Sequence, residues 1–529
     1  MWAAFPSSGS SDAFPHLHNL LSMTHLGVRL ATIVVILTAA LLPRVLNLGA
    51  FLTVDEEQWH RNTVGFRDAL QHGDFGGLYQ QHHPGVTTMW LASLTVTADS
   101  WATRLLPAAL ALGVLVGLAW FLMMRLWGWK TATFAALLLA LNPLFIAHSR
   151  VLAMDALQAV FMALSALGAL VWIEQRKPRW LIFSGAMTAL AILSKFPAVV
   201  LLPWFALVLV VDFATQRLPR ETGRAALLWG GSLFLTLLIV FPTILTNPQT
   251  IADGIAIFFR EEQYQYRIVH GLGPWWYFQT LLLWSTPIHV LAFVLLPFAV
   301  LASDTQYRRA LGWLGALGIL YFLGMEFSIK KGDRYLLPDF LLIDLLATLV
   351  LGGIVYGLSP RPLLTSRARN VVLAIAVLLL GYQVVEILRL HPYALAYRNP
   401  LFRSIAAGRT MGWGEGLDLA AEYLNAKPNA EKLLVISYWE GPFQYRFRGQ
   451  VTSAERLAQE TVQEIGGEYV VLYRAMEGRA SSRWETKVLL AFRDQTPEHV
   501  IVLNQEPYAW IYAVSDRARS LRPTDDRSE

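Results

Sequence analysis

Residues 54–60 read Val-Asp-Glu-Glu-Gln-Trp-His, and they follow closely on the first long apolar run of the chain, residues 26–48. Three acids therefore stand where a stretch long enough to cross a bilayer ends and a polar loop begins. Ionisable side chains are costly to hold at a membrane boundary, so acids at this place indicate function. The plainer interpretation is a solvated helix start, where acids favour the helix dipole.

The composition is that of an integral membrane protein. Of the 529 residues, 55% are hydrophobic and 15% are charged, whereas soluble proteins carry about 25% charged residues. The 19 Trp and 18 Tyr suit aromatic belts at the two faces of a bilayer. We assign the net charge of +5 to cytoplasmic loops and expect no nucleic-acid partner. The chain has no cysteine, which excludes disulfides and thiolate metal sites.

Apolar runs of spanning length occur about eleven times and predict an α-helical polytopic membrane protein. The runs are residues 26–48, 101–127, 131–148, 153–174, 180–196, 197–213, 225–245, 275–301, 310–328, 336–357 and 370–390. Alternate breaks between them are rich in Lys and Arg, which places those breaks in the cytoplasm. The N-terminus is then cytoplasmic, with residues 1–25 as a disordered leader. Because the number of spans is odd, the C-terminal part lies outside.

One outward loop, residues 329–335, departs from this charge rule. It carries Lys330, Lys331 and Arg334 next to Tyr335. Either the topology is wrong, or these cations bind an anion near the membrane surface, or they simply reach the lipid headgroups. We favour an anion site, because five basic breaks at alternate positions support the topology.

Two more ionisable residues stand at outward ends of apolar segments. Asp155 opens the span 153–174, either as a helix cap or as a second carboxylate that approaches Asp55. Two such carboxylates can hold a divalent metal ion or orient a substrate hydroxyl. Lys195 lies between two apolar segments, and two interpretations stay open: a lysine that reaches the lipid surface, or a member of the same site.

The first outward loop, residues 49–100, is predicted to fold back onto the membrane. Residues 58–70 have helical spacing and suit a helix that lies on the membrane surface. His82 and His83 then precede an apolar run, residues 86–96, that is too short to span a bilayer. Such a loop can cover a cavity.

After residue 390 the composition becomes polar, and alternating strands and helices predict a small α/β domain. Strands are expected at residues 433–437, 469–473, 500–503 and 509–514, and helices at 417–424, 452–465 and 483–492. We therefore expect a transmembrane domain over residues 26–390 and an extracytoplasmic α/β domain over residues 391–529.

Together these features resemble the GT-C membrane glycosyltransferases, in the branch of protein O-mannosyltransferases and lipid A aminoarabinose transferases. The resemblance covers about residues 26–357. It rests on the acids after the first span, on Asp155, and on residues 331–338, which read Lys-Gly-Asp-Arg-Tyr-Leu-Leu-Pro. It implies a GT-C fold of about eleven transmembrane helices.

The chain also departs from that family. His82 and His83 stand where relatives tend to carry a Lys-Pro-Pro-like run, and Glu262 with Gln263 stands where they often carry an acid and a histidine. The resemblance therefore leaves a divalent metal ion open, with Asp55 and Asp155 as its ligands.

The resemblance implies transfer of a sugar, with inversion, from a polyprenyl-phosphate donor to a hydroxyl of a protein, glycolipid or polysaccharide outside the plasma membrane. Asp55 is then the general base, since a carboxylate can take the proton of a hydroxyl. The residues expected around it are Glu56 as a second catalytic acid, Lys331, Arg334, Tyr335, Lys330 and Lys195 for the donor phosphate, and Asp155, His82, His83 and Glu262 for substrate or metal.

Two alternatives remain. A transporter or flippase of a lipid-linked anion would often show two matching halves, and no internal symmetry is visible here. A receptor or assembly scaffold would use the outward charges only as an anchor.

Overall fold

The computed structural model describes residues 23–82, 84–268, 275–302, 304–328, 331–355, 364–406, 412–478 and 483–514. The expected leader, residues 1–25, lies outside these ranges except for its last three residues. His83 and Lys330 also lie outside them, as does the side chain of Glu262.

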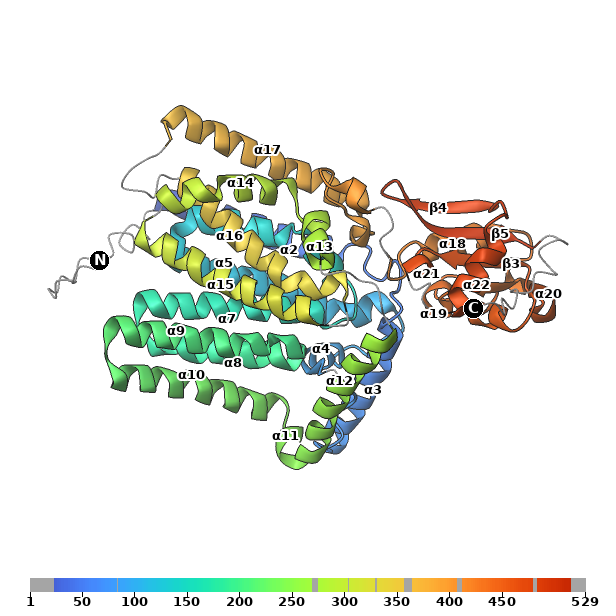
Figure 1. Ribbon diagram of the computed structural model, residues 1–529, viewed down its shortest axis with the longest axis horizontal. Helices are drawn as coiled ribbons and strands as arrows, with labels where there is room; N and C mark the ends of the chain where they lie inside the picture. Colours follow the sequence, from blue (N-terminus) through green and yellow to red (C-terminus); the bar gives the residue numbers. More distant parts are fainter. Residues whose placement is uncertain are drawn as a thin grey trace.

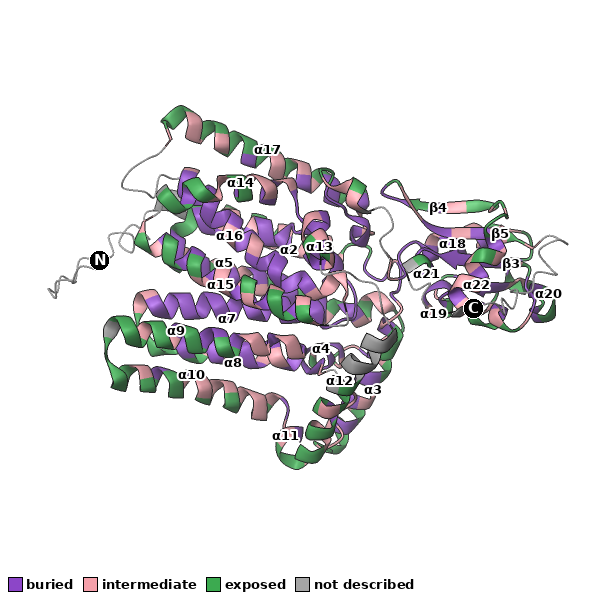
Figure 2. Cartoon of the chain, viewed as in Figure 1, coloured by how far each residue is buried: buried purple, intermediate pink, exposed green. Residues whose placement is uncertain are grey.

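Long apolar helices form a bundle that makes up most of the protein (Figure 1). They are α2 (Met23–Val45), α5 (Trp101–Ala140), α7 (Asp155–Gln175), α8 (Pro178–Ser194), α9 (Leu201–Gln216), α10 (Pro219–Val240), α13 (Trp276–Trp284), α14 (Pro287–Ala302), α15 (Thr305–Phe327), α16 (Leu337–Val355) and α17 (Ser366–Leu390). Helices α7 and α16 are buried along most of their length (Figure 2). Their sequences are apolar on all sides, as a helix in the middle of a bundle requires.

Every predicted apolar run coincides with a helix or with a broken pair of helices. Eight helices among the described residues are long and apolar enough to cross a membrane, or nine if α13 and α14, bent by 110°, form one span. Eleven spans were predicted, and the two that remain are accounted for as follows. Helix α5 covers two predicted runs, which it joins across a kink at Gly128. Helix α8 coincides with another predicted run but has only 17 residues. The protein is a multi-pass membrane protein, and the number of crossings stays a prediction.

Shorter elements gather at one end of the bundle. They are α3 (Glu56–His72), α4 (Val86–Ala92), α6 (Pro143–His148), η2 (Phe196–Val200), α11 (Thr243–Thr246), α12 (Pro248–Ile268), η3 (Asp333–Leu336), η4 (Ala394–Ala396) and η5 (Arg403–Ala406). Helices α3 and α12 run across this end (Figure 1). Helix α3 buries Trp59 and Phe66 in a local core that also contains Met89. The predicted helix at residues 58–70 is therefore confirmed.

The C-terminal region contains a five-stranded sheet with its own hydrophobic core. Its elements are α18 (Leu417–Asn425), η6 (Ala430–Lys432), β1 (Leu434–Ser437), α19 (Glu440–Gln444), β2 (Gln450–Ser453), η7 (Ala454–Ala458), α20 (Val462–Ile465), β3 (Tyr469–Tyr473), α21 (Ala475–Gly478), α22 (Arg483–Phe492), β4 (His499–Leu503) and β5 (Glu506–Ala513). The strand order is β2-β1-β3-β5-β4. Strand β1 is parallel to β2 and β3, while β5 is antiparallel to β3 and β4. The predicted α/β architecture is confirmed, and the boundary at residue 390 stays a prediction.

The helix predicted over residues 452–465 is wrong. Thr452 pairs with Ile436 in the edge strand β2, and two short helical turns follow. The capping box lies later, where Thr461 and Glu464 bond each other's backbone amides. A pairing with a distant strand thus prevails over the local helix signal.

The C-terminal region is attached to the end of the bundle that carries α3. The Tyr445 hydroxyl donates to the Gly49 carbonyl oxygen at 2.8 Å, in the segment that follows α2. At the end of α17, Arg389 donates to the Asn504 side chain at 2.7 Å. Asn504 lies in the turn between β4 and β5 and donates to the Ala396 carbonyl oxygen at 2.8 Å. The sheet is therefore held against two separate parts of the membrane region.

Candidate functional site

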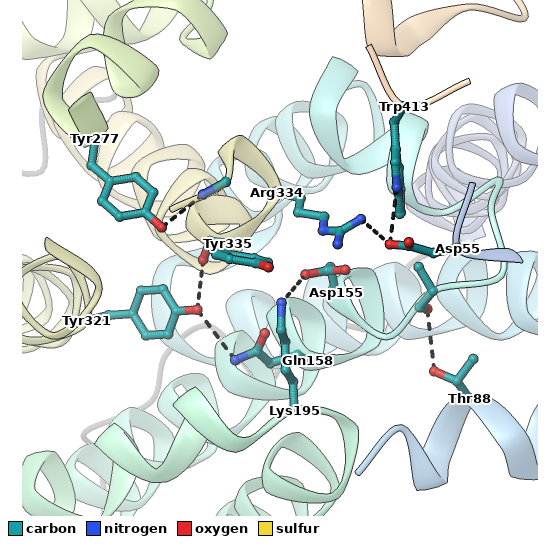
Figure 3. A network of polar contacts seen from close by, with 12 residues as sticks. Asp55, Thr88, Asp155, Gln158, Lys195, Tyr277, Tyr321, Arg334, Tyr335 and Trp413 are labelled. Carbon is teal, nitrogen blue, oxygen red and sulfur yellow. Dashed lines mark hydrogen bonds and ion pairs between the residues drawn. The ribbon is translucent and has the colours of Figure 1, made fainter. Parts of the chain in front are cut away.

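Asp55 and Arg334 meet at the end of the bundle that carries α3. The Arg334 Nη1 donates to the Asp55 Oδ2 at 2.7 Å, so the acid after the first span and the cationic loop before α16 form one site (Figure 3). Asp55 stands at the N-terminus of α3, yet its side chain makes no capping hydrogen bond. Asp55 does occupy the N-cap position of a helix start, and its ion pair with Arg334 is a contact that the plainer interpretation does not require.

A second ion pair lies beside the first. The Lys195 Nζ donates to the Asp155 Oδ1 at 2.6 Å, and these side chains are only 10% and 3% exposed. The ring of Tyr335 lies between the two pairs: Lys195 Nζ is 3.9 Å and the Arg334 guanidinium carbon 5.6 Å from its centre (Figure 3). Two ion pairs from four separate segments thus lie next to one aromatic ring, and they include both predicted carboxylates.

The C-terminal region contributes Trp413 to the same site. Its Nε1 donates to the Asp55 Oδ2 at 3.2 Å, and the Arg334 guanidinium carbon lies 4.2 Å from the centre of its ring. The ring of His148 lies 5.5 Å away and is almost fully buried.

Hydrogen bonds fix the short helix η3, which carries Arg334 and Tyr335. The Asp333 carboxylate accepts from the Thr280 hydroxyl and the Trp284 indole, each at 3.0 Å. The Tyr321 hydroxyl donates to the Tyr335 carbonyl oxygen at 2.8 Å. The side chains of α13 and α15 therefore set where the Arg334 guanidinium can reach.

Glu56, expected as a second catalytic acid, faces the backbone. It is fully buried, and its two oxygens accept from the backbone amides of Thr53 at 2.7 Å and Leu152 at 2.9 Å. Burial raises the pKa of Glu56 to about 7, while those amides act in the opposite direction. Its carboxylate links the chain just before α3 to the chain just before α7, directly beside Asp55.

Lys331 forms a separate ion pair. Its Nζ donates to the Glu326 Oε1 at 2.7 Å and lies 4.8 Å from the centre of the Tyr277 ring. The loop that carries His82 is held beside Lys195 instead, because the Gly85 amide donates to the Ser194 carbonyl oxygen at 3.0 Å. Glu262 lies on α12, with its side chain outside the described residues, as do Lys330 and His83.

A metal ion at Asp55 and Asp155 stays a prediction. Among the described residues, no group of three or more His, Cys, Asp or Glu side chains is arranged to hold one. Arg334 and Lys195 already donate to one oxygen of each acid. The donor set therefore fits cationic side chains in this arrangement, and a divalent ion would compete with them for the same oxygens.

Sequence reasoning missed His148 and Trp413. His148 is the last residue of the apolar run 131–148, and a single histidine in an apolar segment carries little signal. Trp413 lies between glycines in residues 412–416, which read Gly-Trp-Gly-Glu-Gly. Glycines at this spacing can mark a turn or a close backbone approach, and neither points to the tryptophan between them.

Residues 82–245 match the family model described as dolichyl-phosphate-mannose-protein mannosyltransferase. The matched segment contains Asp155 and Lys195, whereas Asp55 and Arg334 lie outside it. No curated protein matches the chain.

Solved structures of archaeal oligosaccharyltransferase share the fold. The apo oligosaccharyltransferase of Archaeoglobus fulgidus superposes with a TM-score of 0.52 at 10% identity, over 88% of this chain and 73% of that one. The oligosaccharyltransferase AglB from Archaeoglobus fulgidus, in complex with an inhibitory peptide and a dolichol-phosphate, superposes with a TM-score of 0.50 at 10% identity. This match covers 89% of this chain and 73% of that one. ArnT from Cupriavidus metallidurans bound to undecaprenyl phosphate superposes with a TM-score of 0.48 at 16% identity. This match covers 94% of this chain and 99% of that one.

Proposed function

Because this chain has the GT-C fold of membrane glycosyltransferases, we propose that it moves a sugar from a polyprenyl-phosphate donor to an extracytoplasmic hydroxyl, with inversion. The observation that carries the proposal is the 2.7 Å contact between Asp55 and Arg334. It brings a carboxylate able to accept a proton next to a guanidinium able to bind phosphate. A fold neighbour solved with a dolichol-phosphate and an inhibitory peptide supports a site where a lipid phosphate and an acceptor could meet.

The charges at the two ends of α7 support the proposed orientation. Asp155 lies at one end in the site, and α7 has 21 residues, a rise of about 30 Å, which is the thickness of a bilayer core. At the other end, the loop of residues 176–179 reads Arg-Lys-Pro-Arg and is rich in cations, as cytoplasmic loops are. In this proposal the basic end is cytoplasmic, with the N-terminus, and the site and sheet lie outside the plasma membrane.

Asp55 acts as the general base. A hydroxyl is a poor nucleophile until its proton is taken, and a carboxylate within hydrogen-bond reach can take it. The Asp55 side chain is 37% exposed, so an acceptor can approach it from outside. The oxygen of the acceptor then attacks the anomeric carbon, the bond to the lipid phosphate oxygen breaks on the opposite face, and the proton stays on Asp55.

Arg334 stabilises the departing phosphate. Its guanidinium can hold two phosphate oxygens at once. The attraction between guanidinium and phosphate is stronger in a site shielded from water. Lys195 supplies a point charge on the other side of the Tyr335 ring, and Lys331 a more distant one. Asp155, in contact with Lys195, then helps to orient sugar hydroxyls.

Each of these three cations is paired with an acid: Arg334 with Asp55, Lys195 with Asp155 and Lys331 with Glu326. A donor phosphate must therefore compete with carboxylates for the cations. When the phosphate takes over Arg334, Asp55 loses its ion-pair partner and becomes available as a base. Donor binding is thus expected to precede deprotonation of the acceptor.

The test is transfer by the purified protein in lipid vesicles from a panel of polyprenyl-phosphate sugars, read by mass spectrometry of the acceptor fraction. Loss of the protein from its host should also cause one lipid-linked sugar to accumulate. If the protein moves a lipid-linked sugar across the vesicle membrane but transfers no sugar to an acceptor, the proposal would be overturned in favour of a transporter.

A further inference from the structure

The glycine-rich segment, residues 412–416, reaches from the C-terminal region to the chain just before Asp55. The Val54 amide donates to the Trp413 carbonyl oxygen at 3.1 Å. Gly414 has a φ of +124°, and a Cβ there would lie 2.4 Å from the Leu52 carbonyl oxygen. Only glycine suits this position, because other residues rarely adopt that φ and would collide with the neighbouring backbone.

The indole of Trp413 acts on one particular oxygen of Asp55. Its Nε1 and the Arg334 Nη1 both donate to Oδ2, at 3.2 and 2.7 Å. Among the described residues, no side-chain hydrogen bond reaches the other oxygen, Oδ1. The two donors thereby fix the carboxylate plane and leave Oδ1 for the hydroxyl of an acceptor.

The sheet of the C-terminal region holds Trp413 in place. The Glu415 Oε2 accepts from the Trp413 amide at 2.7 Å. The Tyr473 hydroxyl donates to the Glu415 carbonyl oxygen at 3.0 Å and accepts from the Gly414 amide at 3.1 Å. Tyr473 is fully buried at the end of β3, the middle strand of the sheet. The position of the indole is therefore set by the sheet.

We propose that Trp413 is a positioning residue that orients the Asp55 carboxylate, so that the C-terminal region completes the site in the membrane region. The proposal rests on the proposed sugar transfer. It assigns to the C-terminal region a direct part in the reaction, with Glu415 and Tyr473 as the supports of Trp413.

The test compares two conservative variants of the full-length protein. Trp413→Phe keeps an aromatic ring at this position and removes the N–H that bonds Asp55, together with the five-membered ring that carries it. Tyr445→Phe is the control, because it removes one hydrogen bond by which the same region attaches to the Gly49 carbonyl oxygen, away from Asp55. Both variants are expected to fold, which their melting temperatures in detergent would check.

For Trp413→Phe we expect kcat to fall about tenfold, which corresponds to ~1.4 kcal/mol, with little change in the KM for donor. Independently of transfer, labelling of Asp55 by a water-soluble carbodiimide, read by peptide mass spectrometry, should increase severalfold. Neither change is expected in Tyr445→Phe.

Equal behaviour of the two variants in both measurements would overturn this inference and leave the sugar transfer standing. A parent protein that transfers no sugar would overturn the proposed function instead. In that case the labelling of Asp55 alone decides whether Trp413 positions it.

Discussion

Arg334 and Asp55 share a hydrogen bond of 2.7 Å although 279 positions of sequence separate them. Each therefore sets the electrostatic surroundings of the other, and neither can be replaced without leaving its partner unbalanced. The consequence for experiment is that a variant at one position must be read together with a control that tests the fold.

Asp55→Asn should abolish sugar transfer while the protein still folds. The amide keeps the shape and can still accept from Trp413 and Arg334, but it cannot take a proton, so we expect kcat to fall by at least about 10²-fold. Asp68→Asn, an exposed acid on the same helix α3, is the matched control and should transfer like the parent. Retention of transfer by Asp55→Asn would remove Asp55 from the role of base.

Arg334→Lys should weaken use of the lipid donor. Lysine keeps the charge but loses the planar pair of donors that can hold two phosphate oxygens. We expect the KM for donor to rise by about tenfold and the KM for acceptor to change little. Arg309→Lys, in the ion pair with Glu174 at the opposite end of the bundle, is the control. Equal donor KM values for Arg334→Lys and the parent would exclude Arg334 from the phosphate site.

Lys195 and Asp155 should show strong coupling in stability. Both are nearly buried, so Lys195→Met leaves an unpaired acid in a low-dielectric interior, at a cost of ~3–5 kcal/mol. The double variant Lys195→Met with Asp155→Asn removes both charges and should be more stable than Lys195→Met alone. Melting temperatures in detergent would measure this, and additive losses in the double variant would contradict a direct pair.

Glu56 should make stability depend on pH. Its pKa rises from an ordinary value near 4.5 to about 7 in the folded protein. Between these two pH values the folded protein therefore binds more protons than the unfolded chain does. The stabilisation is complete below pH 4.5 and is lost as pH rises through about 7, by an amount on the order of 3 kcal/mol.

The melting temperature of the parent should therefore fall more steeply than that of Glu56→Gln between about pH 5 and about pH 7.5. Glu57→Gln, an exposed neighbour on α3, controls for the change of residue type and should keep the slope of the parent. Identical slopes for Glu56→Gln and the parent would show that Glu56 does not titrate in this range.

Much of the fold could be predicted because its signals are local. Each apolar run from 26–48 to 370–390 coincides with a helix or with a broken pair of helices, since the length of a run reports directly on the thickness of a bilayer. Four of the five strands were predicted from short apolar segments rich in β-branched and aromatic residues. The edge strand β2 was missed because its sequence, Gln-Val-Thr-Ser at 450–453, is mostly polar and is held by pairing with β1.

Part of the candidate site could likewise be predicted from the sequence, and part could not. Asp55, Asp155, Lys195 and Arg334 could be found from the sequence because a charge at a membrane boundary is costly and so carries information. Only the tertiary structure decided that Lys195 pairs with Asp155, that Glu56 bonds the backbone, and that Trp413 reaches Asp55 from the C-terminal sheet. Hydropathy acts on each segment separately, whereas these contacts join segments up to 358 positions apart and depend on how the helices and the sheet pack.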